Sequence, residues 1–240
     1  MLEIEGLEKH YGDLKAVKSL SLTIQPGEIF CMLGANGAGK TTTLMVSLGF
    51  TDPTRGTVKI CGIDVTRDPL EAKKHVAYVS ENVMLYGNFT ARQNLDFFTK
   101  LGGVKDATDQ DYKQVLKRVG LQDDAFNRRV KGFSKGMRQK LGIAIAIMKD
   151  AEVILLDEPT SGLDPKSGAE FLQLLNELRA ENKTIWMTTH DIFRAKEIAD
   201  RVGIMVAGTL VQLLTREELQ QQDLEALYVQ YVSQATEEAE

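Results

Sequence analysis

Short apolar runs separated by turn residues fill the first part of the chain. Residues 2–11 and 14–24 flank a glycine turn and predict two strands. From Leu20 to Ile24 apolar and polar residues alternate, which is typical of a half-buried antiparallel strand. The next run, 29–33, is apolar throughout and predicts a strand that is buried on both faces of a parallel sheet.

Strand-like and helical segments continue to alternate beyond this point. The further strand candidates are 57–61, 75–80, 153–157, 184–189 and a hairpin of 202–206 with 209–213. The helix candidates are 42–48, a short helix that follows Pro69, 166–181, a helix that Asp191 caps, and a C-terminal segment from Leu219 to Val232. The alternation predicts an α/β fold built on a parallel sheet.

Residues 90–150 have a different character. Apolar residues recur there at helical spacing, for example from Tyr112 to Val119, and no strand candidate appears before Val153. We therefore predict one domain, 1–240, with an α/β core and β-subdomain at 1–89 and 151–214, a helical subdomain at 90–150, and an acidic C-terminal helix or tail at 215–240.

The composition is that of an ordinary soluble globular protein. Of 240 residues, 43% are apolar and 26% are charged. No apolar run approaches the roughly 20 residues that a membrane span needs, and Met1 leads into a strand-like segment rather than a signal peptide. Cys31 and Cys61 lie in apolar runs and predict small core residues rather than a disulfide or metal site. We expect a cytosolic protein.

The net charge of −5 is unevenly distributed. Residues 215–240 hold seven acidic residues and one basic residue, so the remainder is close to neutral. Because no basic stripe follows any predicted element, we expect no nucleic-acid partner.

The clearest chemical motif is Gly34-Ala35-Asn36-Gly37-Ala38-Gly39-Lys40-Thr41, which fits the phosphate-binding pattern G-x-x-x-x-G-K-[ST]. A buried strand precedes it and a helix follows it, which argues against a glycine-rich turn that matches by chance. Backbone N–H groups then face the anion, Lys40 reaches the β- and γ-phosphates, and the Thr41 hydroxyl holds Mg²⁺. The predicted nucleotide contacts are Gly34, Asn36, Gly37, Ala38, Gly39, Lys40, Thr41 and Thr42.

Polar residues follow two further apolar runs. Asp157 and Glu158 end one of them, and His190 follows another. Ligands of parallel sheets bind where the carboxyl ends of the strands meet, so we expect these residues to lie beside the loop. Asp157 is expected to hold Mg²⁺ through water, and Glu158 to deprotonate an attacking water in phosphoryl transfer. The alternatives are two surface acids and a structural histidine.

Several segments occur together in the order and spacing of the ATP-binding cassette (ABC) ATPases. They are the phosphate-binding loop, Phe133 to Met137, Val153 to Glu158, Ser161 to Asp164, and His190. The chain resembles this family from about Leu2 to Val211. The resemblance implies a P-loop NTPase (RecA-like) core with an N-terminal antiparallel β-subdomain and an inserted α-helical subdomain. It also implies ATP hydrolysis with Mg²⁺.

In that family two cassettes close head-to-tail over two ATP molecules, as a homodimer or a heterodimer. By this resemblance Ser134 and Gly136 meet the γ-phosphate on the partner, and Asp164 lies at the dimer interface. His190 would contact the γ-phosphate and the attacking water, and Tyr11 would stack on adenine. Considered alone, Ser134 and Asp164 fit helix N-caps and Tyr11 fits a packing residue.

The chain departs from the family pattern in two places. The usual Leu-Ser-Gly-Gly-Gln segment has Phe133, Lys135 and Met137 at three of its positions, and the usual Gln after the 75–80 strand is Glu81. Glu81 is a candidate Mg²⁺ ligand that would also bring negative charge near the γ-phosphate. The variant segment resembles that of ATPase subunits of ABC-2-type exporters.

The resemblance implies a motor subunit whose ATP-dependent closure drives a separate transmembrane permease subunit, for export. The loop at about 82–92 is where transport members of the family receive the membrane partner. Such a subunit is cytoplasmic and peripheral on the inner face of the cell membrane through the permease. The alternatives are an importer ATPase and a soluble ABC-type ATPase that acts on the ribosome or on DNA. A P-loop kinase would leave the Ser134 and His190 motifs unexplained.

Overall fold

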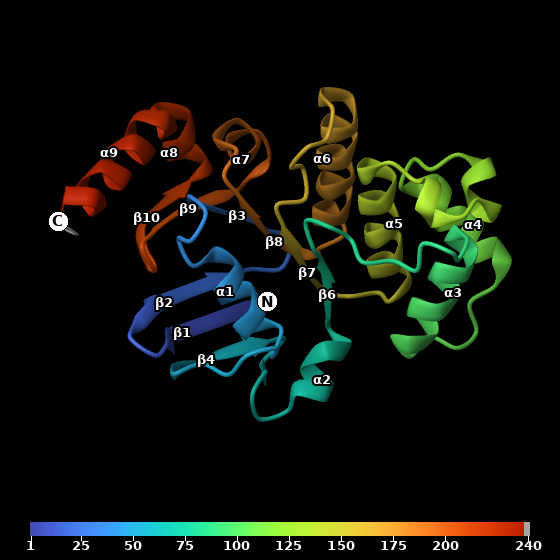
Figure 1. Cartoon of the computed structure of the whole chain (residues 1–240), viewed down its shortest axis with the longest axis horizontal. Helices are drawn as coiled ribbons and strands as arrows, with labels where there is room; N and C mark the ends of the chain where they lie inside the picture. The colour runs from blue at the N-terminus through green and yellow to red at the C-terminus, as the bar shows by residue number, and fades with distance from the viewer. Residues whose placement is uncertain (238–240) are drawn as a thin grey trace.

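Strands and helices alternate along residues 1–237, the part of the chain that the computed structural model describes (Figure 1). The strands are β1 (Leu2–Tyr11), β2 (Leu14–Ile24), β3 (Ile29–Leu33), β4 (Arg55–Ile60), β5 (Ile63–Asp64), β6 (Val76–Val79), β7 (Val153–Asp157), β8 (Thr184–Thr189), β9 (Arg201–Val206) and β10 (Thr209–Thr215). The helices are α1 (Lys40–Ser47), α2 (Pro69–Lys74), α3 (Ala91–Leu101), α4 (Asp109–Arg118), η1 (Asp123–Asn127), η2 (Val130–Gly132), α5 (Lys135–Met148), α6 (Pro165–Ala180), α7 (Ile192–Ile198), α8 (Arg216–Gln221) and α9 (Leu224–Glu237). Each strand that the sequence predicts is present.

The strands form two sheets. An antiparallel sheet has the order β2-β1-β4-β5, and a second sheet has the order β10-β9-β3-β8-β7-β6. From β9 to β6 the neighbours of the second sheet are parallel, and β10 pairs antiparallel with β9 as the predicted hairpin. The α/β fold class with an antiparallel β-subdomain is therefore confirmed.

Strand β3 lies in the middle of the second sheet and is fully buried. Because side chains alternate along a strand, Ile29, Cys31 and Leu33 pack with the helices on one face. Phe30 and Met32 pack on the other face with the antiparallel sheet and α1, where the Phe30 ring meets Trp186 edge-on. The prediction of a strand buried on both faces is confirmed, and the segment after β3 starts from a rigid support.

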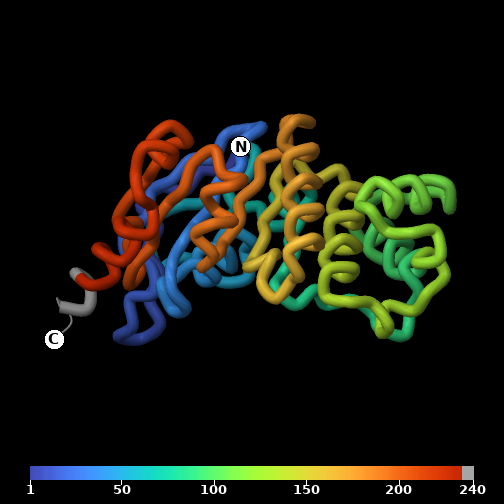
Figure 2. The backbone as a smooth tube through the Cα atoms, turned by 90° about the horizontal axis from the view of Figure 1, so that it is seen from above, coloured from blue at the N-terminus to red at the C-terminus, as the bar shows by residue number. Residues whose placement is uncertain are grey.

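The helices of residues 90–150 lie at one end of the molecule, and α8 and α9 lie at the other (Figures 1 and 2). Side-chain caps define their starts: Thr90 and Thr108 form capping boxes at α3 and α4, and Ser134 caps α5. Strands β6 and β7 precede and follow this helical segment and are neighbours in the sheet. The segment is therefore an insertion between adjacent strands.

Two local predictions are wrong in detail. The C-terminal segment forms two helices rather than one, because Gln222 is extended and the Asp223 carboxylate accepts the N–H groups of Glu225 and Ala226 to begin α9. Cys61 lies in the turn between β4 and β5 rather than in a strand. It has φ of 51° beside Gly62 at 79°, the left-handed pair of a tight hairpin turn.

The last part of the predicted tail, 238–240, lies outside the described residues. Among helices of residues 1–237, none has the length and apolar character to cross a bilayer.

Candidate nucleotide-binding site

The segment between β3 and α1 folds its backbone tightly against its neighbours. Gly37 and Gly39 have φ of 83° and 105°, which side chains rarely tolerate. A Cβ on Gly39 would lie 2.4 Å from the Ala16 carbonyl oxygen, and one on Gly34 would lie 2.5 Å from that of Met205. Glycine is therefore required at these positions before α1. As at the start of any α-helix, the first N–H groups of α1 have no hydrogen-bond partner within the helix.

Lys40 lies inside this loop and is almost fully buried. Its ammonium group donates to the Gly34 carbonyl at 2.5 Å and to the Ala35 carbonyl at 3.2 Å. The same nitrogen lies 3.5 Å from Glu158 Oε1. Backbone oxygens and one carboxylate thus hold a buried cation at the floor of the loop, where a phosphate would compete for it.

Asp157 is buried at the end of β7 and is held by hydroxyl groups. Thr188 Oγ1, on the neighbouring strand β8, donates to its Oδ1 at 2.6 Å, and Thr41 Oγ1 lies 3.3 Å from both carboxylate oxygens. Tyr78 on β6 is a further partner, which no sequence motif marks. Burial and then the adjacent Asp157 carboxylate, to which its hydroxyl donates, raise the pKa of Tyr78 well above its ordinary value.

Glu158 follows directly and has a left-handed backbone, with φ of 47°. Its N–H donates to the Thr188 carbonyl at 3.1 Å, which holds this conformation. The side chain lies between Lys40 and His190, whose Nδ1 is 2.9 Å from Glu158 Oε2. His190 itself is largely exposed. Residues held in sparsely populated conformations cluster at functional sites, and here the strain turns the carboxylate toward the loop.

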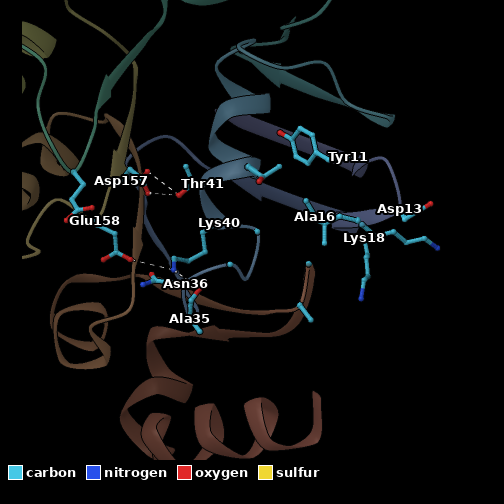
Figure 3. Close-up of a pocket in the computed structure, with 18 residues that line it drawn as sticks. Tyr11, Asp13, Ala16, Lys18, Ala35, Asn36, Lys40, Thr41, Asp157 and Glu158 are labelled. Atoms are coloured by element: carbon cyan, nitrogen blue, oxygen red, sulfur yellow. Dashed lines mark hydrogen bonds and ion pairs between the residues drawn. The ribbon is translucent and has the colours of Figure 1, made fainter. Parts of the chain in front are cut away.

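These residues line one open cavity of about 790 Å³, which spans the distance from the Tyr11 region to Asp157 and Glu158 (Figure 3). Its size is typical of a small-molecule site. Of the predicted nucleotide contacts, the cavity is lined by Tyr11, Asn36, Gly37, Gly39, Lys40, Thr41, Thr42, Glu81, Asp157 and Glu158. Gly34 and Ala38 belong to the same loop but do not line the cavity. His190 does not line it either, but it contacts Glu158, which does. No sequence motif marks the other lining residues outside the phosphate-binding loop, which are Asp13, Leu14, Lys15, Ala16, Lys18, Ala207 and Gly208.

Tyr11 lies at the outer end of the cavity and is half exposed. It is the last residue of β1, so its ring is not buried in the sheet as a packing residue would be. Lys9 Nζ lies 4.9 Å from the ring centroid. The ring therefore offers an aromatic surface at the end of the cavity opposite Asp157 and Glu158 (Figure 3).

Glu81 lies at the edge of the cavity, but its carboxylate already has partners. Lys135 Nζ is 3.2 Å from Oε1, and Ser161 Oγ donates to the same oxygen at 3.1 Å. The Lys135 hydrogen bond, helped by Ser161, lowers the pKa of the Glu81 carboxyl below its usual value. Within residues 1–237 no group of three or more His, Cys, Asp or Glu side chains gathers as a metal site.

Ser134, Gly136 and Asp164 do not line the large cavity of their own chain. Ser134 Oγ accepts the Met137 N–H as the N-cap of α5, and Asp164 caps α6 through the Ser167 N–H. Ser134 and Gly136 instead line a separate cavity of about 240 Å³. The structure therefore divides the predicted residues into two surfaces, one at the phosphate-binding loop and one at the start of α5.

Comparison with known proteins relates this geometry to a family. The family model described as "ABC transporter" matches residues 17–161. The bacitracin transport ATP-binding protein BcrA of Bacillus licheniformis is 36% identical, over 98% of this chain and 76% of the relative. The Nod factor export ATP-binding protein I of Burkholderia lata is 38% identical, over 86% of this chain and 68% of the relative. A dimeric post-hydrolysis structure of the ATP-binding cassette MJ0796, bound to ADP and Pi, has a TM-score of 0.81 at 26% identity and covers 90% of this chain and 99% of that one.

Proposed function

This chain belongs to the ABC transporter family of ATPases, and we propose that it is the ATP-driven motor subunit of an exporter. It binds and hydrolyses ATP as the family does. The observation that carries the proposal is the division of its motifs into two surfaces. The loop, Asp157 and Glu158 surround one cavity, while Ser134 faces another. A head-to-tail dimer would join the two surfaces, and a similar cassette, MJ0796, is described as dimeric. Export is supported by the relative named for Nod factor export.

Mg²⁺ fits the donor set at the end of β7. Thr41 and Asp157 present only oxygen atoms, and their hydrogen bond at 3.3 Å leaves both groups near one point. This hard cation takes few carboxylates and completes its shell with water and phosphate oxygens. Bound there, it would neutralise charge on the phosphates. Glu81 is a third candidate ligand, at the edge of the same cavity.

The side chains of this chain would then act on the γ-phosphate as follows. Lys40 exchanges its carbonyl partners for β- and γ-phosphate oxygens. Glu158 accepts a proton from the attacking water, and His190 holds the Glu158 carboxylate by its Nδ1 contact and faces the same phosphate. Tyr11 stacks on adenine at the far end of the cavity. Asn36, Gly37 and the adjoining loop residues bind phosphate through backbone N–H groups.

Ser134 and Gly136 would complete the site of the second subunit, and Asp164 would lie between the two subunits. Ser134→Arg should therefore leave ATP affinity unchanged, because Ser134 is absent from its own chain's large cavity. The ATP-dependent dimer should be lost and hydrolysis should fall about 10²-fold, in line with the removal of one transition-state donor. Sedimentation with ATP and steady-state phosphate release measure both effects.

Thr108→Arg is the matched control for this variant. It removes an exposed N-cap hydroxyl from α4 in the same subdomain and adds the same side chain. Both variants lose a cap worth roughly 1 kcal/mol of stability. If Ser134→Arg dimerises with ATP as the Thr108→Arg control does, Ser134 has no part in the site.

The surface that would receive the permease is an exposed apolar group on the loop after β6 and on α3. We call it the aromatic patch, and it consists of Met84, Tyr86, Phe89, Phe97 and Leu101. The Tyr86 ring packs at about 5 Å from those of Phe89 and Phe97, and a hollow of about 460 Å³ opens beside Phe97. Contiguous exposed aromatic side chains mark protein contacts. Through this patch the chain would lie on the cytoplasmic face of the cell membrane.

The test is recovery of the membrane partner. Tagged Glu158→Gln protein with ATP is incubated with detergent-solubilised membranes of the native host, and bound proteins are identified by mass spectrometry. We expect a polytopic membrane protein at a fixed stoichiometry, which Phe97→Glu in the aromatic patch should release without affecting ATP binding. Ribosomal proteins or nucleic acid, without a membrane protein, would refute transport and leave the ATPase. The recovered partner's architecture separates export from import.

A further inference from the structure

The Glu81 carboxylate joins three segments that are far apart in the sequence. Glu81 follows β6, Lys135 is the first residue of α5, and Ser161 lies in the loop between β7 and α6. Lys135 Nζ and Ser161 Oγ both reach Glu81 Oε1, at 3.2 and 3.1 Å. Glu81 and Lys135 are also two of the positions at which the chain departs from its family's usual residues. The two departures are therefore in contact with each other.

Lys135 is an unfavourable residue for the place it occupies. The N-terminal turn of a helix carries partial positive charge and favours acidic side chains, so a lysine there destabilises the helix. Helix α5 has no acidic residue in its first turn. The Glu81 carboxylate, from outside the helix, supplies the negative charge at this end. Helix stability alone does not account for Lys135, whereas a contact with Glu81 does.

The same face of α5 contacts the same short segment at its next turn. Gln139 is fully buried, and its Nε2 donates to the Ser80 and Glu81 carbonyl oxygens at 3.2 and 2.9 Å. Residues four apart lie on one helix face, so Lys135 and Gln139 reach Glu81 side by side. One turn further on, a Cβ on Gly142 would lie 3.1 Å from Val79, which shows how closely the helix approaches β6.

We propose that Lys135 is a positioning residue whose ion pair with Glu81 fixes the first turn of α5, and with it Ser134, to the edge of the chain's own ATP cavity. The inference rests on the proposed function, because it gives Ser134 a role in the partner's site. Glu81 lines the cavity of its own chain, while Ser134 faces outward. In a dimer the pair would thus link the two ATP sites through one polypeptide. Gln139 and Gly142 hold the body of the helix, and the ion pair holds its exposed end.

A double-mutant cycle measures this link in nucleotide-free protein. The variants are Glu81→Gln, Lys135→Gln and the double variant. Each removes charge with a neutral polar side chain that matches glutamate in length and is one atom shorter than lysine. Hydrogen–deuterium exchange of residues 133–141 reports opening of the first turn, since the Met137 N–H bonds to Ser134 Oγ and the Arg138 N–H to the Ser134 carbonyl. Each single variant should exchange two- to five-fold faster, which is about 0.4 to 1 kcal/mol at 1.4 kcal/mol per factor of ten. The double variant should match the single ones.

Salt and a neighbouring lysine provide the controls. Lys131→Gln removes an exposed positive charge four residues before Lys135 and should leave the exchange unchanged. Raising the salt to 1 M should speed exchange in the native protein toward that of the variants, because both partners are partly exposed and the ions screen them. Additive effects in the cycle, or a Lys135→Gln rate equal to that of Lys131→Gln, would overturn the inference.

Dimer formation separates this inference from the proposed function. The cycle is repeated in the Glu158→Gln background with ATP, and the dimer dissociation constant is measured by sedimentation. If the parent protein forms no ATP-dependent dimer, the proposed function fails, and the exchange result in nucleotide-free protein still decides whether the ion pair positions the helix. If the parent dimerises, each charge-neutralised variant should raise the dissociation constant about three-fold, again without additivity. Equal dissociation constants would overturn the role of Lys135.

Discussion

Glu158→Gln is expected to bind ATP and to lose at least about 10²-fold in turnover, the range typical for removal of a general base. Glutamine has the shape of glutamate but cannot accept a proton from water at neutral pH. The site should stay assembled, because the left-handed backbone is held by the Glu158 N–H bond to the Thr188 carbonyl. Loss of negative charge beside Lys40 and near the γ-phosphate should favour the bound nucleotide. ATP should therefore accumulate in a closed dimer.

Single-turnover phosphate release and sedimentation with ATP measure these two effects. Glu152→Gln serves as the control, since Glu152 is an exposed glutamate that pairs with His75 away from the cavity. The control should hydrolyse ATP at the native rate and form no long-lived dimer. Steady-state hydrolysis by Glu158→Gln at more than about a tenth of the native rate would be too small a loss for a general base. The water would then be activated by another group.

The phosphate-binding loop could be predicted from sequence because its determinants are adjacent along the chain. A buried apolar run, glycines with positive φ and a helix start follow one another within 29–47. Asp157 and His190 could be predicted to approach the loop by one rule, since β3, β8 and β7 are parallel neighbours whose carboxyl ends meet. The local sequence pattern and the geometry of a parallel sheet are therefore enough to predict which residues meet at the site, provided that each residue lies at the end of a strand.

Contacts between separate subdomains could not be predicted in this way. Glu81 and Lys135 are 54 residues apart, and they meet only because α5 docks against β6. Helical periodicity identifies the helix but not the face or the depth at which it docks. The outer wall of the cavity has the same origin: Lys18 reaches it because its N–H bonds to the Gly208 carbonyl at 2.7 Å, which ties β2 to the β9–β10 turn. Such pairings depend on packing, which no local motif encodes.

Lys40→Ala is expected to weaken ATP binding by about 10- to 100-fold, the net loss of one hydrogen bond to a charged group, worth about 1.5–3 kcal/mol. The ammonium group is nearly buried and already held at the floor of the loop by the Gly34 and Ala35 carbonyls, so little ordering is needed when phosphate arrives. A pre-positioned cation in a low-dielectric site contributes more than the same charge on a mobile surface side chain.

The alanine variant also changes the site in the absence of nucleotide. Glu158 Oε1 loses its cation at 3.5 Å, while Oε2 of the partly buried carboxylate keeps its contact with His190 Nδ1. Lys40→Met separates loss of the charge from loss of the buried stem, because it removes the ammonium group but keeps most of the apolar side chain. Both variants should show the same loss in ATP affinity by calorimetry, while the methionine variant should unfold closer to the native temperature. An ATP dissociation constant within two-fold of the native value in Lys40→Met would place the phosphates elsewhere in the cavity.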